Sequence, residues 1–223
     1  MKIRLKKINR GIVLAIVLLI GLVVFVMVDN HNFKSEKAEI EKMTEDYVAG
    51  INDFNAAYYK EKFPNKKLTK EQEDKILSQG KEIFNKLWIS GKPSGSTQWS
   101  SHKTDMMSTL DYHVKDNQFQ QSIVQECNFN IKEMKVSKNG PNSALVDVTM
   151  NSKVIGSGDI IAFSPSGTDN MLYTEQPSDV EQLKLVKGEG LFTVELSRTD
   201  DGWKIKSVQG YFYELSSADI TVE

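Results

Sequence analysis

The sequence predicts an α+β protein in which an N-terminal transmembrane helix is followed by helices packed on a curved antiparallel sheet. Three observations predict this class. An unbroken apolar run occupies residues 11–28. Apolar residues then recur every three or four positions up to about residue 90, as on one face of a helix. From Ile123 onward they alternate with polar residues, as in half-buried strands. Because the helices precede the strands, we expect them to cover one face of the sheet.

The run 11–28 is long enough to cross a bilayer. A helix rises about 1.5 Å per residue, so the run reaches roughly 27 Å, close to the roughly 30 Å of hydrocarbon in a membrane. A cleaved signal peptide is the alternative. It would have a shorter apolar core and small residues at its cleavage site, whereas Val26 and Val28 stand at the end of this run. We therefore expect an uncleaved anchor.

The residues around the run predict its orientation. Residues 1–10 carry no acidic side chain and five basic ones, Lys2, Arg4, Lys6, Lys7 and Arg10. Such an excess stays on the cytoplasmic side of a membrane, so we expect a single-pass protein of the cell membrane with residues 1–10 in the cytoplasm and the C-terminal domain extracytoplasmic. The rest of the chain is acidic overall, which argues against nucleic acid as a partner.

Beyond the run we expect a polar hinge at 29–34 and one extracytoplasmic α+β domain at 35–223. That length suits a single domain with a sizeable core. The chain has one cysteine, Cys127, which cannot form an internal disulfide and is expected to be buried.

Two helices are predicted in the first half of the domain. Ser35 is expected to cap the first, whose apolar stripe comprises Ile40, Met43, Tyr47, Val48, Ile51, Phe54 and Tyr58. Thr69 and Gln72 form a capping box at the start of the second, which continues to Trp88. The stretch 97–125 is ambiguous, and its apolar spacing mildly favours a third helix.

Two hairpins are predicted in the second half. Strands at 129–136 and 143–150 flank a turn, and the later pair turns at Asp200, Asp201 and Gly202. The apolar parity changes near Ser207, which predicts a β-bulge. Between the hairpins, 163–179 is polar and rich in turn residues, so we expect a long loop that could contact a partner.

No catalytic, cofactor or metal motif is apparent, and the sequence predicts a domain that is not an enzyme. The three histidines lack the spacing of a metal site. Asp111 or His113 could serve as a general base in a small pocket, and this alternative stays open. Tyr211, Phe212 and Tyr213 form a candidate interface, since aromatic residues at an exposed strand end are common in interfaces; packing in the core is the alternative.

Three segments resemble the nuclear transport factor 2-like (cystatin-like cone) superfamily. They are IFNKLWISG (83–91), SALVDVTM (143–150) and LFTVELSRTDDGWKIKSVQGY (191–211). The resemblance implies a cone-like domain. Together with the basic tail and single span, the chain is similar to the bitopic inner-membrane assembly components of type IV secretion and conjugation systems. That likeness implies a structural role, with other membrane-complex proteins or a second copy of the chain as partners. A membrane-tethered ligand-binding or sensory ectodomain is the alternative, because a concave sheet can form an apolar pocket.

Overall fold

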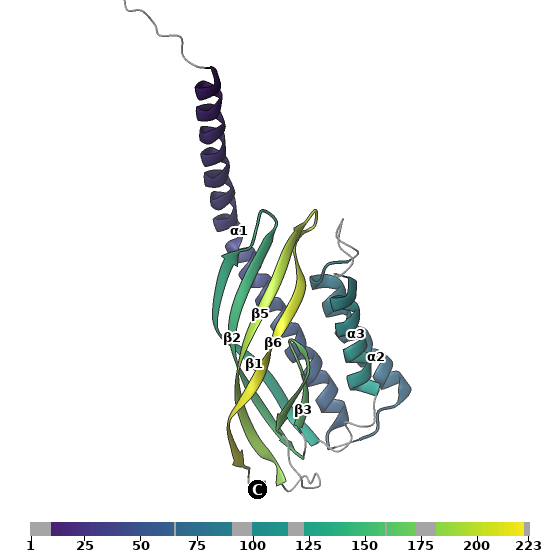
Figure 1. The fold of residues 1–223 in the computed structure, drawn as a ribbon. Helices are drawn as coiled ribbons and strands as arrows, with labels where there is room; N and C mark the ends of the chain where they lie inside the picture. The colour runs from purple at the N-terminus through teal and green to yellow at the C-terminus, as the bar shows by residue number, and fades with distance from the viewer. Residues whose placement is uncertain are drawn as a thin grey trace, which may run out of the picture. The chain divides into compact units, whose positions relative to one another are not determined.

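The computed structural model describes residues 10–64, 66–90, 100–115, 123–158, 160–172 and 182–220. The chain forms two compact units, Met1–Ala38 and Glu39–Glu223. The elements follow in the order α1 (Arg10–Lys62), α2 (Lys70–Leu87), α3 (Ser100–Lys115), β1 (Ile123–Lys138), β2 (Ser143–Ser157), β3 (Ile160–Ser164), β4 (Gly167–Leu172), β5 (Lys184–Thr199) and β6 (Gly202–Asp219) (Figure 1). Helices precede strands, and the predicted α+β class is confirmed.

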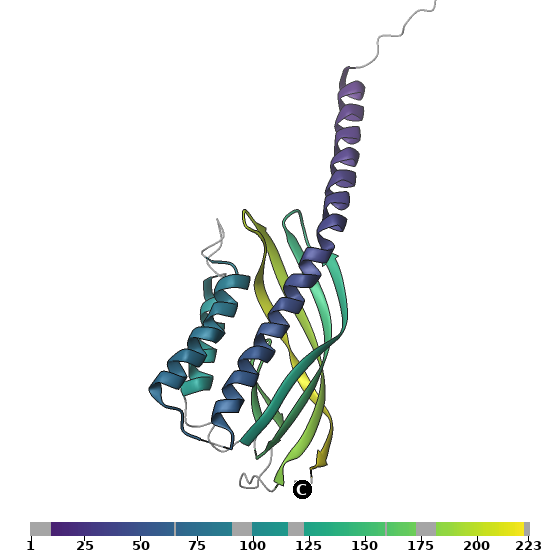
Figure 2. The same ribbon diagram turned by 180° about the vertical axis from the view of Figure 1, so that it is seen from behind.

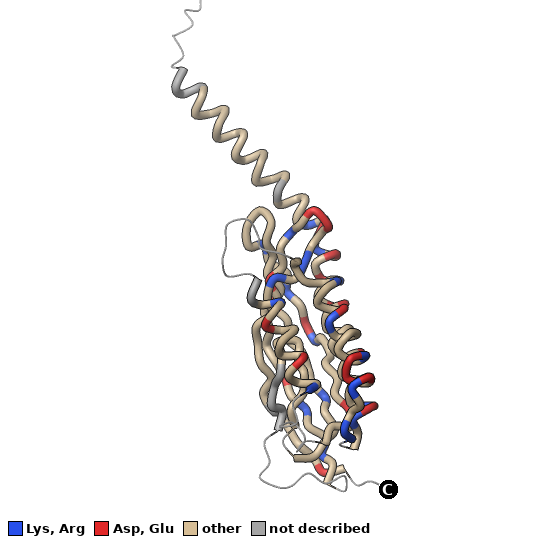
Figure 3. The backbone as a smooth tube through the Cα atoms, turned by 90° about the vertical axis from the view of Figure 1, so that its right-hand side faces the viewer, with Lys and Arg blue, Asp and Glu red and all other residues tan. Residues whose placement is uncertain are grey.

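The described part of the first unit is helical. Its side chains from Leu14 to Val28 are exposed, and no charged residue interrupts this stretch (Figure 3). Within the described ranges, α1 is the one helix that is long and apolar enough to cross a membrane, judged by length and composition alone. The boundaries proposed for the tail, span and domain stay predictions.

The residues of the expected polar hinge, 29–34, are helical in the structure. Neither Gly nor Pro occurs between Gly21 and Gly50, and the helix propensities of Asp, Asn and His are unfavourable by only a few tenths of a kcal/mol each. Ser35 therefore caps nothing. It lies inside α1, where its hydroxyl donates to the Asn32 carbonyl at 2.7 Å.

The predicted apolar stripe on α1 is confirmed. All of its members are buried except Met43, which is half-buried. Figure 2 shows the part of α1 that belongs to the second unit lying across the sheet, and α2 and α3 lie side by side in both ribbon views. α3 settles the ambiguous stretch 97–125 for residues 100–115; residues 97–99 and 116–122 lie outside the described part of the chain.

The capping box at the start of α2 is confirmed. The Gln72 backbone N–H donates to the Thr69 hydroxyl at 3.3 Å, and the Thr69 N–H donates to Gln72 Oε1 at 2.9 Å. We expect Thr69→Ala to lower the free energy of unfolding by about 1 kcal/mol, because a helix N–H loses its acceptor. Urea unfolding followed by circular dichroism would measure this loss. Thr69→Ser keeps the acceptor and should be close to neutral; an equal loss in both variants would contradict the capping role.

The main sheet is antiparallel, with strand order β1-β2-β5-β6. Both predicted hairpins are confirmed, with Val136 opposite Val146 and Thr199 opposite Gly202. The predicted bulge is confirmed too: Glu195 pairs with Ser207 and Leu196 with Ile205, so Lys206 is the extra residue. The inner face carries the buried side chains Ala144, Val146, Val148, Met150, Phe192, Val194 and Leu196.

The loop expected at 163–179 is partly wrong, because β3 and β4 form a second, two-stranded sheet there. Phe163 is fully buried, and the turn uses Gly167 at a φ of +122°, which only glycine adopts without strain. The sequence of β4, GTDNML, does not alternate between apolar and polar residues, so it does not indicate a strand. Residues 173–179 lie outside the described part of the chain.

Aromatic side chains fill the space between the helices and the sheets. Phe54 of α1 and Phe84 of α2 both meet Phe163 edge-on, with ring centroids 5.4 Å and 6.4 Å from it. Trp88 follows α2 and packs edge-on against Phe84 at 5.6 Å. Such contacts stabilise a core beyond the area they bury.

Candidate functional site

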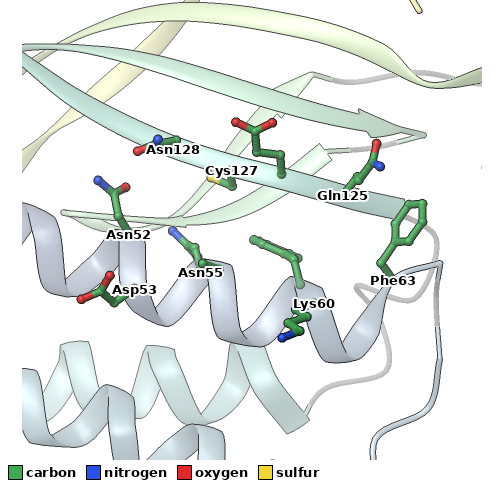
Figure 4. Close-up of a pocket in the computed structure, with 11 residues that line it drawn as sticks. Asn52, Asp53, Asn55, Lys60, Phe63, Gln125, Cys127 and Asn128 are labelled. Atoms are coloured by element: carbon green, nitrogen blue, oxygen red, sulfur yellow. The ribbon is translucent and has the colours of Figure 1, made fainter. Parts of the chain in front are cut away.

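A cavity of about 560 Å³ lies between the second half of α1 and the start of β1. Its lining includes Asn52, Asn55, Ala56 and Tyr59 from α1, Phe63 just after α1, and Gln125, Cys127 and Asn128 from β1 (Figure 4). The α1 residues are spaced by one, three or four positions, so they share a face of the helix. The sequence alone did not predict that this face of α1 borders a cavity.

Asn52 joins the helix to the strand. Its side-chain N–H donates to the Phe129 carbonyl at 2.8 Å, and the Phe129 N–H donates to Asn52 Oδ1 at 2.9 Å. β1 is an edge strand, so its outward backbone groups have no strand partner there. One amide side chain thus takes the place of a neighbouring strand at Phe129 and sets one wall of the cavity.

Asn55 is fully buried and half-satisfied. Its Nδ2 donates to the Phe163 carbonyl at 2.8 Å, whereas its Oδ1 has no hydrogen-bond partner. Turning the amide over would bring its oxygen against the Phe163 oxygen, so the orientation is fixed. The structure therefore leaves a buried acceptor among the residues that line the cavity.

Cys127 and Tyr59 are neutral groups at this cavity. Cys127 is 5% exposed, which confirms the expected burial. Burial and the charge of Glu126 raise the pKa of its thiol, so it is not the thiolate that a nucleophile needs. Burial also raises the pKa of Tyr59 well above its usual value. The Tyr59 hydroxyl donates to the Ile161 carbonyl at 3.3 Å.

The two candidate bases do not come together. His113 is 1% exposed and lies in the aromatic core, with ring centroids 5.3 Å from Tyr58 and 5.7 Å from Phe163. Burial, and then the charge of Lys62, lower its pKa to about 3. Asp111 instead pairs with Lys81 of α2 at 2.7 Å. Within the described ranges, no group of three or more His, Cys, Asp or Glu side chains could hold a metal ion.

The candidate interface on β6 is divided between the two faces of the sheet. Tyr211 is 63% exposed and Tyr213 is 40% exposed, and Leu191, opposite Tyr211 on β5, is 55% exposed. Phe212 is half-buried and stacks on Phe129 at 4.9 Å. Strict alternation along a strand could have separated these three residues in advance. We use the term outer patch for Leu191, Tyr211 and Tyr213.

No protein-family model matches the sequence, and no curated protein matches it. Solved structures do match. The hexachlorocyclohexane dehydrochlorinase LinA-type3 of Novosphingobium barchaimii LL02 matches over 86% of this chain and 94% of its own, with 9% identity and a TM-score of 0.41. A protein of the NTF2-like family from Streptomyces avermitilis, assigned as a dehydratase, matches over 82% and 99%, with 15% identity and a TM-score of 0.45. The chain is similar to proteins with the NTF2-like fold.

A third match is a protein assigned as a scytalone dehydratase from Novosphingobium aromaticivorans, over 87% of this chain and 93% of its own, with 12% identity and a TM-score of 0.39. These names contradict the expectation of a domain that is not an enzyme, and that expectation is withdrawn. Because all three TM-scores are below 0.5, none of these activities is transferred to this chain. None of the three is named for a secretion system.

Proposed function

We propose that this chain is a membrane-anchored binding protein that recruits another protein of a membrane complex through its outer patch. In this proposal the run 11–28 anchors the chain, and the basic residues before it keep the folded domain on the extracytoplasmic side. A narrower role in a type IV secretion or conjugation machine rests on the sequence resemblance alone.

The outer patch carries the proposal. Leu191 and Tyr211 are directly opposite each other in the sheet, and the Tyr211 and Tyr213 rings are 6.5 Å apart between centroids. Isolated exposed apolar side chains are ordinary on protein surfaces. These three instead form one continuous area, and tyrosine is among the residues that contribute most to binding energy in interfaces.

Polar pairs surround the patch. Glu189 accepts from Lys132 of β1 at 3.1 Å and from the Tyr213 hydroxyl at 3.2 Å. Further along the same face, the Thr193 hydroxyl donates to Asp147 at 3.2 Å. An apolar centre with a hydrogen-bonded polar border is the usual anatomy of a protein interface. The expected partner therefore presents an apolar side chain to the two tyrosines and polar groups to the border.

Site-specific photocrosslinking in cells tests the proposal. We expect a photoreactive phenylalanine analogue at position 211 to form an adduct with one other protein of the same membrane, and Leu191→Ser to abolish that adduct. Asn151, exposed on the same face of β2, provides the matched control position and the control variant Asn151→Ser. Equal labelling from positions 211 and 151 would contradict the proposal. An adduct between two copies of the chain would replace recruitment by self-association.

A ligand-binding role is the second candidate. The concave side that was expected to form its pocket is filled by aromatic side chains, but the cavity between α1 and β1 offers another location.

A further inference from the structure

We propose that a groove between α1 and α2 binds a short, basic, amphipathic helix of another protein. The groove has a volume of about 520 Å³, and its lining residues lie between Asp46 and Ala57 of α1 and between Gln79 and Leu87 of α2. We use the term helical groove for it. The inference does not depend on the outer patch, which lies on β5 and β6.

The floor of the helical groove is apolar. Ala49 and Ala57 contribute only methyl groups, and Ile83 of α2 is half-buried. A Cβ at Gly50 would come within 3.1 Å of Ile83, so the missing side chain lets Ile83 lie directly on the backbone of α1. Small side chains allow the axes of packed helices to come closer together. A third helix can therefore pack against both α1 and α2.

The groove favours a helix over an extended segment. The backbone groups inside α1 and α2 are bonded within each helix, so a strand would find no backbone partner there. A helix brings its own hydrogen bonds and needs only an apolar stripe to enter a groove. Asp46 and Ala57 are 11 positions apart on α1, which is roughly 16 Å, or about three turns of a bound helix.

The rim of the helical groove is acidic. Asp46 and Asp53 lie on the α1 side, and Asp46 pairs with Lys42 at 3.1 Å. Glu82 lies on the α2 side, where Lys86 is the one basic residue of the described lining. Asp53 and Glu82 are exposed and have no ion pair among the described residues. Carboxylates on both sides of an apolar floor suit a helix with lysine or arginine on both sides of its apolar stripe.

Asp53 is central to this charge pattern. It lies four positions after Ala49 and four before Ala57, so its neighbours along the surface of α1 are short side chains. Asp53 also borders the cavity between α1 and β1, but in Figure 4 it is not directed toward β1 as Asn52 is. A basic side chain of the partner can therefore reach the Asp53 carboxylate from the open side of the groove.

The same charges argue against two other occupants. A second copy that docked groove to groove would bring another acidic rim against this one, and like charges across an interface are unfavourable. An anionic membrane surface attracts basic segments, so it would repel Asp53 and Glu82.

Peptide binding to the full chain, held in phosphatidylcholine nanodiscs, tests the proposal. Three labelled peptides of about 15 residues, near the lower limit for a stable helix, would share one stripe of leucine and alanine. Their other positions would carry arginine, glutamine or glutamate. Fluorescence anisotropy would be measured with empty nanodiscs as the blank for binding to lipid. We expect the arginine peptide to bind saturably and most tightly; absence of saturable binding, or equal affinity for all three peptides, would overturn the proposal.

Variants locate the site. We expect Asp53→Lys combined with Glu82→Lys to weaken the arginine peptide roughly tenfold and to strengthen the glutamate peptide, because two attractions become repulsions. Glu45→Lys combined with Asp74→Lys is the matched control, since these residues are exposed on α1 and α2 but lie outside the lining. Ala49→Trp should abolish binding by filling the groove. An equal effect of the two charge reversals, or unchanged binding to Ala49→Trp, would overturn the site.

Discussion

Phe163→Ala is expected to lower the free energy of unfolding by about 3–5 kcal/mol, the usual cost of removing a buried phenylalanine ring. Phe163 is fully buried and meets the rings of Phe54, Phe84 and His113. These three residues come from three different helices, α1, α2 and α3. The space left by the missing ring would therefore weaken the packing of all three helices against β3. Fluorescence of the buried Trp88 and Trp203 during urea unfolding would report the loss.

Leu191→Ala is the control for that measurement. It also truncates a large apolar side chain, but Leu191 is exposed, and surface substitutions usually change stability by less than about 0.5 kcal/mol. If the two variants lost similar stability, Phe163 would not occupy the centre of the core.

Acidification is expected to destabilise the domain through His113. Its pKa is about 3 in the folded state, against 6.5 for an unperturbed histidine. Between these values the unfolded chain binds a proton that the native chain does not, so the stability from His113 is complete above pH 6.5 and is lost as the pH falls. Each pH unit costs about 1.4 kcal/mol, which makes the loss at pH 5 about 2 kcal/mol.

Unfolding curves at pH 5 and pH 7 for the original chain and for His113→Phe would isolate this contribution. The variant keeps a ring among Tyr58, Tyr59 and Phe163 but cannot be protonated, so its stability should change less between the two pH values. An unchanged pH dependence in the variant would assign the acid sensitivity to other groups.

Local signals predicted most of the fold. The Thr69 capping box, the Asp-Gly turn at 200–202 and the bulge at Lys206 each depend on residues close together in the sequence, and the structure has all three. The helical stripe of α1 and the alternation in β2 also identified the buried faces correctly. β3 was missed because its burial depends on contacts with distant helices, which a short apolar run does not reveal.

The cavity could not be predicted in the same way. Asn55 meets Phe163 across more than one hundred positions of sequence, and a single Asn in a helix gives no sign of burial. Asn52 likewise bonds to a strand that begins far along the chain. The histidines attracted attention for their chemistry, yet His113 is held in the core by the aromatic rings around it.

The two hydrogen bonds between the Asn52 side chain and the Phe129 backbone also protect part of the edge of the main sheet. An edge strand can template the addition of strands from other chains, which is a route to aggregation. At Phe129 both backbone groups are already occupied by the Asn52 amide, so an incoming strand would first have to displace a side chain. Copies of the chain could then lie against each other at high concentration without joining their sheets at this point of the edge.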